Sequence, residues 1–274
     1  MKIGFIGTGN MGRILIEAFC EAKVSTPSSL FITNRTIQKA YAIKRKYPEI
    51  HVCTSSIEVV HQSDFIFLCV KPLDIHPLLK ELKTGLQGHQ CLISITSPIS
   101  VEQIESAVPC QVARVIPSIT NRAKAGAALL TFGNRCSEHT RNIILSMFEK
   151  ISKPILIENN ITRVASDIVS CGPAFFSFLL QKFIEAAEAE TDISKEDAVQ
   201  LANEMMIGIG KLLESGYYTL PTLQEKVHVK GGVTGEGIKV LENELGDMFH
   251  HLFQSTHAKF DEDLQKVRHQ FDNE

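Results

Sequence analysis

Features that would assign this 274-residue chain to a membrane or secreted class are missing. Its longest apolar runs, such as 65–70, are far shorter than the roughly 20 residues that span a bilayer. Glycines and an asparagine within 4–10 interrupt the unbroken apolar stretch that a secretory signal needs. We therefore expect a cytoplasmic protein with no membrane partner.

An excess of charge is also lacking. Lys and Arg total 28 against 31 Asp and Glu, and apart from 44–46 the basic residues are scattered. This distribution forms no footprint for nucleic acid. The seven cysteines include no CxxC pair, and the histidines match no metal-ligand spacing. We expect buried free thiols, no metal site and no nucleic-acid partner.

The length, at about 150 residues per domain, favours two domains. The first half alternates short β-branched runs with helical stretches, which predicts a parallel sheet with helices on both faces, a doubly wound Rossmann-type α/β domain. The expected strands are 2–6, 30–33, 65–70, 91–96, 111–116, 127–132 and 153–158, with helices at 11–22, 38–47 and 73–82.

From about residue 161 the pattern becomes helical. Apolar residues recur at spacings of three and four over 175–189, 195–213 and 236–271, which predicts an all-α domain. We place the junction within 155–162, giving domains 1–158 and 159–274. The apolar stripe of the last segment needs a partner, either its own domain or a second subunit. A second subunit would make a homodimer or a higher homo-oligomer through the C-terminal helices.

Residues 7–12 read Gly-Thr-Gly-Asn-Met-Gly between the first expected strand and the first expected helix. In this context Gly7 permits a tight turn, Gly9 lets the backbone approach a pyrophosphate, and Gly12 lets helix and strand pack closely. The helix N-terminus adds free N–H groups. We predict cofactor contacts from these glycines and from Asn10 and Met11. The alternative is a glycine-rich structural turn.

The end of the second strand indicates which dinucleotide binds. NAD sites usually carry Asp or Glu there, whereas this chain has Asn34, Arg35 and Thr36. Arg35 would face a 2′-phosphate while its two neighbours donate hydrogen bonds. NADPH is therefore expected in preference to NADH. The alternative is a solvated turn with Thr36 as a helix N-cap.

Val70, Lys71 and Pro72 follow another apolar strand, at the sheet edge where ligands of such folds bind. We assign them to the cofactor site, with Lys71 facing the cofactor or a substrate charge. A solvated lysine is the alternative.

Further along, Gly231 and Gly232 open a helical segment that carries Thr234 in its first turn. Paired glycines before a helix leave backbone N–H groups uncovered, so a small carboxylate is a suitable ligand. A flexible loop with a threonine cap explains the same residues. Elsewhere, Pro173 predicts a helix start, and Cys171 has no base placed by spacing to activate it.

Together these segments resemble the pyrroline-5-carboxylate reductase family over essentially the whole chain. The resemblance rests on the opening Ile-Gly-Phe-Ile-Gly-Thr-Gly-Asn-Met-Gly and on the segments 70–72, 114–117, 170–174 and 231–238 with 241–242. The first motif is shared by many dehydrogenases, and the glycine segment 231–238 is nearly specific to this family.

The resemblance implies a Rossmann domain, a dimerising all-helical domain and NAD(P)H-dependent reduction of 1-pyrroline-5-carboxylate to proline. It implies that Thr234 hydrogen-bonds near the imine nitrogen, that the glycine loop holds the carboxylate, and that NADPH carries the chemistry. The implied substrate-binding residues are Val229, Lys230, Gly231, Gly232 and Val233.

This chain departs from the family pattern. Val229 and Lys230 replace the usual Ser-Pro or Thr-Pro pair, His228 stands where a small residue is common, and 117–120 reads Pro-Ser-Ile-Thr instead of Pro-Asn-Thr-Pro. Losing one hydrogen bond to a charged group costs about 1.5–3 kcal/mol, roughly 10- to 150-fold in binding. The divergence resembles the branch encoded beside bacterial late-competence genes. Two alternatives stay open, a reductase of another small imine or carbonyl compound and a non-catalytic NADP-binding regulator.

Overall fold

The computed structural model describes residues 1–229 and 231–271. The chain forms two compact units, Met1–Pro173 together with the segment from Ser255 onward, and Ala174–Gln254. The division predicted from sequence, at residues 158 and 159, therefore differs from the compact units. The first is called the sheet unit below, and the second the helical unit.

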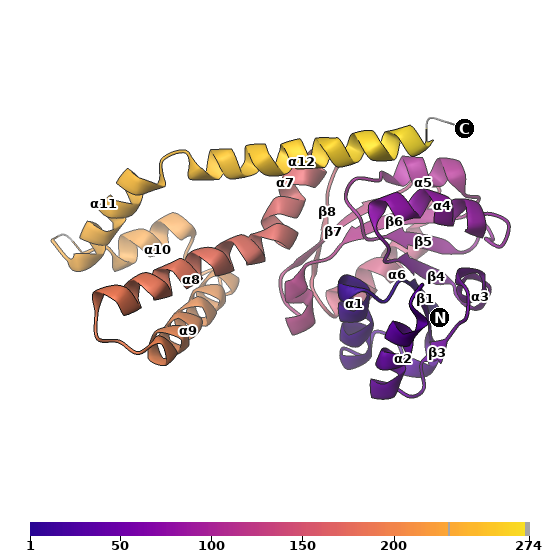
Figure 1. Ribbon diagram of the computed structural model, residues 1–274, viewed down its shortest axis with the longest axis horizontal. Coiled ribbons are helices and arrows are strands. Elements are labelled where there is room, and N and C mark those ends of the chain that lie inside the picture. The colour runs from indigo at the N-terminus through magenta and orange to yellow at the C-terminus, as the bar shows by residue number, and fades with distance from the viewer. Residues whose placement is uncertain (230, 272–274) are drawn as a thin grey trace. The chain divides into compact units, whose positions relative to one another are not determined.

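Within the residues that the structure describes, eight strands form one sheet, in the order β3-β2-β1-β4-β5-β6-β7-β8 (Figure 1). They are β1 (Ile3–Ile6), β2 (Leu30–Thr33), β3 (His51–Val52), β4 (Phe65–Leu68), β5 (Cys91–Ser94), β6 (Gln111–Ile116), β7 (Ala127–Phe132) and β8 (Lys153–Leu156). The chain moves outward from β1 to β3 and then returns to pair β4 with the other side of β1. This reversal leaves a crevice for ligands at the carboxyl ends of β1 and β4.

One strand pair departs from the predicted parallel sheet, because β7 runs antiparallel to β6. A parallel crossover needs about a dozen residues or more, usually a helix. Only residues 117–126 join these two strands, and they hold the short 3₁₀ helix Ile119–Ala123. Lys124 at φ 56° and Gly126 at φ 74° complete the reversal.

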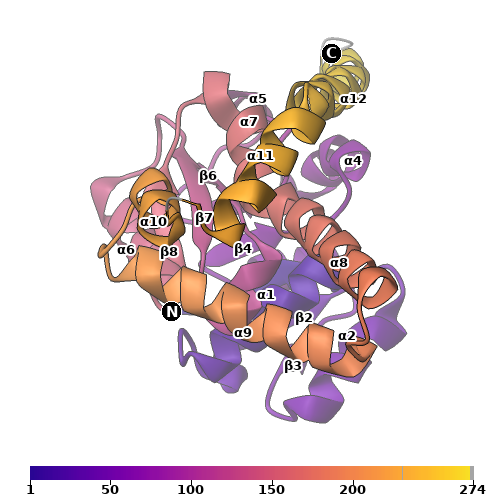
Figure 2. The same ribbon diagram turned by 90° about the vertical axis from the view of Figure 1, so that its left-hand side faces the viewer.

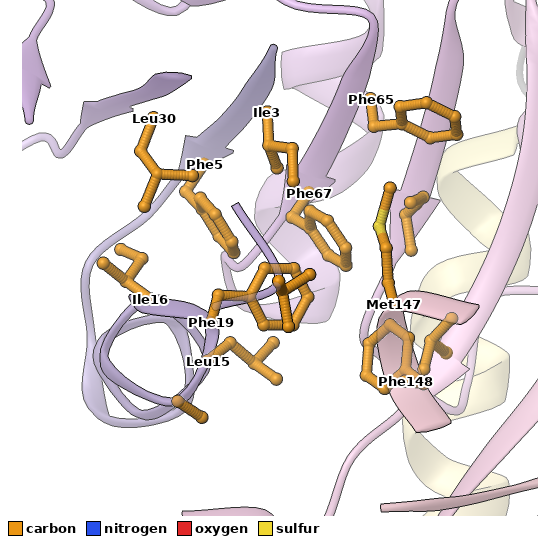
Figure 3. Packing of buried hydrophobic residues seen from close by; sticks show 14 of the residues in the cluster. Ile3, Phe5, Leu15, Ile16, Phe19, Leu30, Phe65, Phe67, Met147 and Phe148 are labelled. Carbon is orange, nitrogen blue, oxygen red and sulfur yellow. The ribbon is translucent and has the colours of Figure 1, made fainter. Parts of the chain in front are cut away.

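Successive strand residues point to opposite faces and form two cores. On one face, the side chains of α1 (Asn10–Glu21), α2 (Ile37–Lys46) and α6 (Glu138–Glu149) cover the sheet, and Phe5 stacks on Phe67 at 4.8 Å with Phe19 edge-on to both (Figure 3). On the other, α3 (Ser56–Gln62), α4 (Pro72–Leu82) and α5 (Val101–Ala107) pack with Val267.

The predicted helix start at Pro173 is wrong. A continuous helical run passes through α7 (Thr162–Ser166), a π turn (Asp167–Cys171) and α8 (Gly172–Glu190). Proline has no N–H to donate to the carbonyl four residues earlier and would clash with it, and a π turn relieves that conflict. The carbonyl in question belongs to Val169, and it accepts a 2.7 Å hydrogen bond from the Ser118 hydroxyl instead.

The helical unit contains most of α8 with α9 (Lys195–Glu214), α10 (Leu220–Val227) and α11 (Val233–Leu245). A short turn joins α8 to α9, as Figure 2 shows, and Ile184 packs between them against Ala198 and Ala202. Other apolar side chains of this unit stay exposed, including Phe176, Phe178 and Phe183 at 58%, 58% and 64%.

The predicted segment 236–271 divides into two helices. Gly246, at φ 44°, follows α11, and α12 (Met248–Phe271) begins after it. The C-terminal part of α12 belongs to the sheet unit, where Val267 is fully buried. For this residue the first alternative, packing on its own helical domain, is not observed, because Val267 is buried against α3, α4 and α5 of the sheet unit.

Within the described residues, one helical stretch, 159–190, is long and apolar enough to cross a membrane by length and composition. Length and composition alone are weak evidence for a membrane span, since helices of soluble proteins that bury an apolar face against protein also meet this criterion.

Candidate cofactor and substrate sites

The glycine loop after β1 has the geometry that a dinucleotide needs. Gly7 adopts φ 102°, and a Cβ there would collide with the carbonyl oxygen of Cys69. A Cβ at Gly12 would collide with the carbonyl oxygen of Gly7. By contrast, nothing lies within 4 Å of a Cβ built on Gly9, so its backbone borders open space. Two glycines are thus required by packing, and the third leaves room for a ligand.

The N-terminus of α1 is available to an anion. Gly9 is its N-cap, its first turn has no side-chain cap and no acidic residue, and Asn10 is exposed. The backbone N–H of Thr8 donates to Asn34 Oδ1 at 2.9 Å, which ties the loop to the end of β2. These uncapped N–H groups suit the pyrophosphate of a dinucleotide.

The segment after β2 also fits the predicted 2′-phosphate. Arg35 and Thr36 are exposed, and Thr36 occupies the N-cap position of α2 without a side-chain cap bond. The alternative role of its hydroxyl as a cap is therefore not observed. Asn34, however, uses its amide to hold the turn, because Nδ2 donates to the Thr36 carbonyl at 3.0 Å. Arg35 and the Thr36 hydroxyl are left to bind a ligand.

A single cleft of about 610 Å³ brings three predicted segments together, namely the glycine loop, residues 34–36 and residues 70–71. Lys39 lines the same cleft, and the sequence analysis missed it. Its signal was available, because it lies only four residues after Arg35, in the first turn of α2. Asn10, Met11 and Gly12 lie beside the lining. We call this the cofactor cleft.

The predicted substrate loop lies in the helical unit. Gly231 adopts φ 76°, Gly232 is the N-cap of α11, and Thr234 is half-buried in its first turn. Val229 and Val233 are 67% and 90% exposed. Lys230 lies outside the described residues. One expectation is corrected, since the N–H of Gly232 is not uncovered but donates to the Val229 carbonyl at 2.8 Å.

Arg114 is a buried cation that the sequence analysis noted only as part of a motif. Burial lowers the pKa of its guanidinium to about 10. The guanidinium donates hydrogen bonds of up to 3.4 Å to oxygens of Ser97, Ile99, Thr131, Asn159 and Thr162. These bonds attach the start of the long helical run to the sheet, which is why residues 159–173 belong to the sheet unit.

All seven cysteines are free, as predicted. Burial raises the pKa of the Cys20 and Cys53 thiols to about 11, so neither is an activated nucleophile. Within residues 1–229 and 231–271 no cluster of His, Cys, Asp and Glu is suited to a metal ion.

Known proteins resemble this chain over its full length. It is 59% identical to the ComE operon protein 4 of Bacillus subtilis, over 99% of both chains. Residues 159–263 match the family described as pyrroline-5-carboxylate reductase dimerisation, and residues 2–98 match the one described as NADP oxidoreductase, coenzyme F420-dependent. The chain belongs to the pyrroline-5-carboxylate reductase family.

More distant relatives agree with this assignment. The chain is 27% identical to pyrroline-5-carboxylate reductase 3 of Bacillus subtilis, over 95% of this chain and 96% of that one. Its fold matches the pyrroline carboxylate reductase of Plasmodium falciparum with NADP bound, with a TM-score of 0.83 at 20% identity, over 97% and 98% of the two chains. The predicted family, the fold class, the NADP cofactor and an oxidoreductase of the C=N-reducing type are confirmed.

Proposed function

We propose that this protein reduces 1-pyrroline-5-carboxylate to proline with NADPH, in the cytoplasm and as a homodimer. The observation that carries the proposal is a dinucleotide cleft without a carboxylate at residues 34–36, in a chain whose residues 159–263 match the reductase dimerisation family and whose residues 2–98 match an NADP oxidoreductase family. The seven free cysteines support a reducing compartment.

In the cofactor cleft, the N–H groups at the start of α1 would hold the pyrophosphate, and Arg35 with Thr36 would hold the 2′-phosphate. Val70, Lys71 and Pro72 would border the cofactor at the end of β4. When bound, NADPH supplies the hydride. A protonated imine gains it at carbon and becomes the secondary amine directly, so this step needs no protein acid. The protein acts by positioning the substrate.

In the helical unit, the loop from Val229 to Val233 would bind the substrate, and Thr234 would hydrogen-bond near the imine nitrogen. Support comes from the uncapped N-terminus of α11, which starts at Val233 after a glycine N-cap. The first N–H groups of α11 attract a carboxylate, although the N–H of Gly232 already donates to the Val229 carbonyl.

The exposed valines favour a second candidate, reduction of a small imine that lacks the carboxylate. Val229 places an isopropyl group where the family usually has a hydroxyl, and Val233 adds another apolar side chain to the loop. Because the loop can form fewer hydrogen bonds to a carboxylate, it discriminates less strongly against substrates that lack one.

The test compares NADPH oxidation with 1-pyrroline-5-carboxylate and with 1-pyrroline, which has no carboxylate. Wild type is assayed beside Val229→Ser and the matched control Val227→Ser, an exposed valine at the end of α10. Turnover of the carboxylate substrate by wild type supports the proposal, and preference for 1-pyrroline supports the second candidate. NADPH binding without turnover of either substrate would point to the regulatory alternative. Thr234→Ala should lower the rate and leave the NADPH affinity intact.

The homodimer would bury the apolar side chains that the helical unit exposes, among them Phe176, Phe178 and Phe183. Patches of this kind mark association sites. Sedimentation velocity checks this, because Phe183→Glu should shift the protein toward monomer. Tyr41→Glu, at an exposed position on α2, should not.

A further inference from the structure

Helix α4 contains an interior proline, Pro77, and the structure shows how the resulting gap in its hydrogen bonding is filled. In a regular helix the N–H of residue 77 would donate to the Leu73 carbonyl, but proline has no N–H. The Leu73 carbonyl instead accepts a 3.1 Å hydrogen bond from Gln270 Nε2 of α12, 197 residues further along the chain. A side chain of the C-terminal helix therefore completes the backbone hydrogen bonding of α4.

The last turn of α12 presents one side to α4, and in Figure 1 this end of α12 lies beside it. Val267, Gln270 and Phe271 are three and four residues apart, which places them on one side of a helix. Val267 is fully buried in the core that α4 shares with α3 and α5. The Phe271 ring lies 4.5 Å from the ring of His76, a buried residue of α4. Apolar packing on both sides thus holds the Gln270 amide within reach of the Leu73 carbonyl.

Another side of α4 forms a wall of the cofactor cleft. The lining residues share one side of the helix, and they are Asp74, Pro77, Leu78 and Glu81. Pro77 therefore both removes the helical hydrogen bond and lines the cleft. An interior proline bends or breaks a helix unless the freed groups find other partners. The contact that satisfies the Leu73 carbonyl consequently also fixes the wall that a dinucleotide meets.

We infer that Gln270 is a positioning residue for the cofactor cleft, because it supplies the hydrogen bond that Pro77 cannot make and so holds α4 in the geometry that binds the dinucleotide. The inference deepens the proposed function, since it rests on the assignment of this cleft to NADPH. Gln270 is not among the described residues that line the cleft, so its effect passes through α4. Without its hydrogen bond α4 would sample other geometries, and affinity falls with the fraction of molecules in the binding-competent one.

The test is a double-mutant cycle, measured by calorimetric titration with NADP⁺. Gln270→Met removes the donor but keeps an unbranched side chain, and it should raise the Kd roughly 2- to 10-fold. Pro77→Ala restores a backbone N–H for the Leu73 carbonyl. In that background Gln270→Met should change the Kd by less than about twofold, because the carbonyl no longer depends on Gln270.

Two further glutamines provide matched controls for the same substitution. Gln265→Met, at an exposed position of α12, should change neither the Kd nor Tm. Gln90 is buried at the opposite edge of the sheet, before β5, where its Nε2 donates to the carbonyls of Val60 and Ser63 at 2.7 and 2.8 Å. Gln90→Met should therefore lower Tm while leaving the Kd unchanged, which separates positioning of α4 from a general loss of stability.

Equal rises in Kd from Gln270→Met in the two backgrounds would overturn the inference. An unchanged Kd in the wild-type background, or an equal rise from Gln90→Met, would overturn it as well. NADP⁺ binding that follows the predicted cycle, without turnover of 1-pyrroline-5-carboxylate, would support the inference and count against the proposed reaction. Wild-type protein that binds no NADP⁺ would overturn both. Gln270→Asn, whose amide is one methylene shorter, is a second variant that should raise the Kd in the same way.

Discussion

The Ser118 hydroxyl donates a 2.7 Å hydrogen bond to the carbonyl oxygen of Val169, across 51 residues of sequence. Pro173 leaves that carbonyl without its helical partner, since proline has no N–H. Ser118 is fully buried, and its own backbone N–H donates to Asn121 at 2.8 Å. One serine thus joins the β6–β7 connection to the π turn.

Removing this hydroxyl should destabilise the sheet unit. Ser118→Ala leaves the Val169 carbonyl unpaired, which should lower the free energy of unfolding by about 1–3 kcal/mol. The control is Ser177→Ala, whose hydroxyl bonds the Ala174 carbonyl in an exposed part of α8 and should cost less than about 0.5 kcal/mol. Urea unfolding curves measure both, and equal losses would contradict the role of Ser118.

The three loop glycines should respond differently to alanine. Gly7→Ala and Gly12→Ala create backbone collisions and should lower Tm by several degrees, since 1 kcal/mol corresponds to about 2–4 °C in a protein of this size. Gly9→Ala meets no atom within 4 Å, so its Tm should stay close to that of wild type while NADPH binding weakens. Differential scanning calorimetry and NADPH titration separate the two effects. Undiminished NADPH affinity in Gly9→Ala would remove that glycine from the cofactor site.

The choice between NADPH and NADH should depend on Arg35. A hydrogen-bonded charge is worth about 1.5–3 kcal/mol, so Arg35→Ala should weaken NADPH binding by roughly 10- to 150-fold and NADH binding little. Arg45→Ala, at an exposed arginine in the last turn of α2, the helix that follows Arg35, is the matched control. The Kd values come from titration of each variant with both cofactors, and equal losses would argue against a 2′-phosphate contact.

Lowering the pH should reveal how much the Arg122–Glu21 ion pair contributes to the stability of the folded protein. The Arg122 guanidinium, through its hydrogen bonds to the carboxylate, is the main cause that lowers the pKa of Glu21 from 4.5 to about 2. Because the folded-state pKa is the lower one, the stabilisation is present above pH 4.5 and lost as the pH falls toward 2.

Arg122→Gln should therefore be less stable than wild type at neutral pH. The difference in free energy of unfolding between wild type and Arg122→Gln should narrow as the pH falls from 4.5 to 2. Urea unfolding across this interval measures it. Parallel pH profiles for the two proteins would show that the pair contributes nothing.

Much of the fold was predictable from sequence because its signals are local. Seven strands are where runs of apolar residues predicted them, and only the two-residue β3 went unnoticed. The antiparallel β7 was not predicted, because strand direction depends on the length and turn residues of the connection to β6, not on the strand's own composition. The break at Gly246 was also missed, since the apolar spacing continues on both sides of it.

The candidate site, like the fold, was predictable from sequence only in part. The glycine loop, Arg35 and Lys71 were identified from order and spacing along the chain, and all line one cleft. Lys39 was overlooked although it lies close to Arg35 in the sequence. A second cavity of about 560 Å³, beside α12, was not identified, because it is assembled from segments up to about 190 residues apart, Pro72 to Asp263. No periodicity in the sequence encodes that proximity.

By itself, the sequence determined the alternating α/β half, the helical half, the dinucleotide loop and the family resemblance, since each follows from residue types at short spacings. Only the tertiary structure decided where the compact units divide, which carbonyl Ser118 satisfies, and that α12 returns to the sheet unit to bury Val267. These outcomes depend on which distant groups can satisfy buried polar atoms and cover apolar surface, and a linear pattern does not specify those partners.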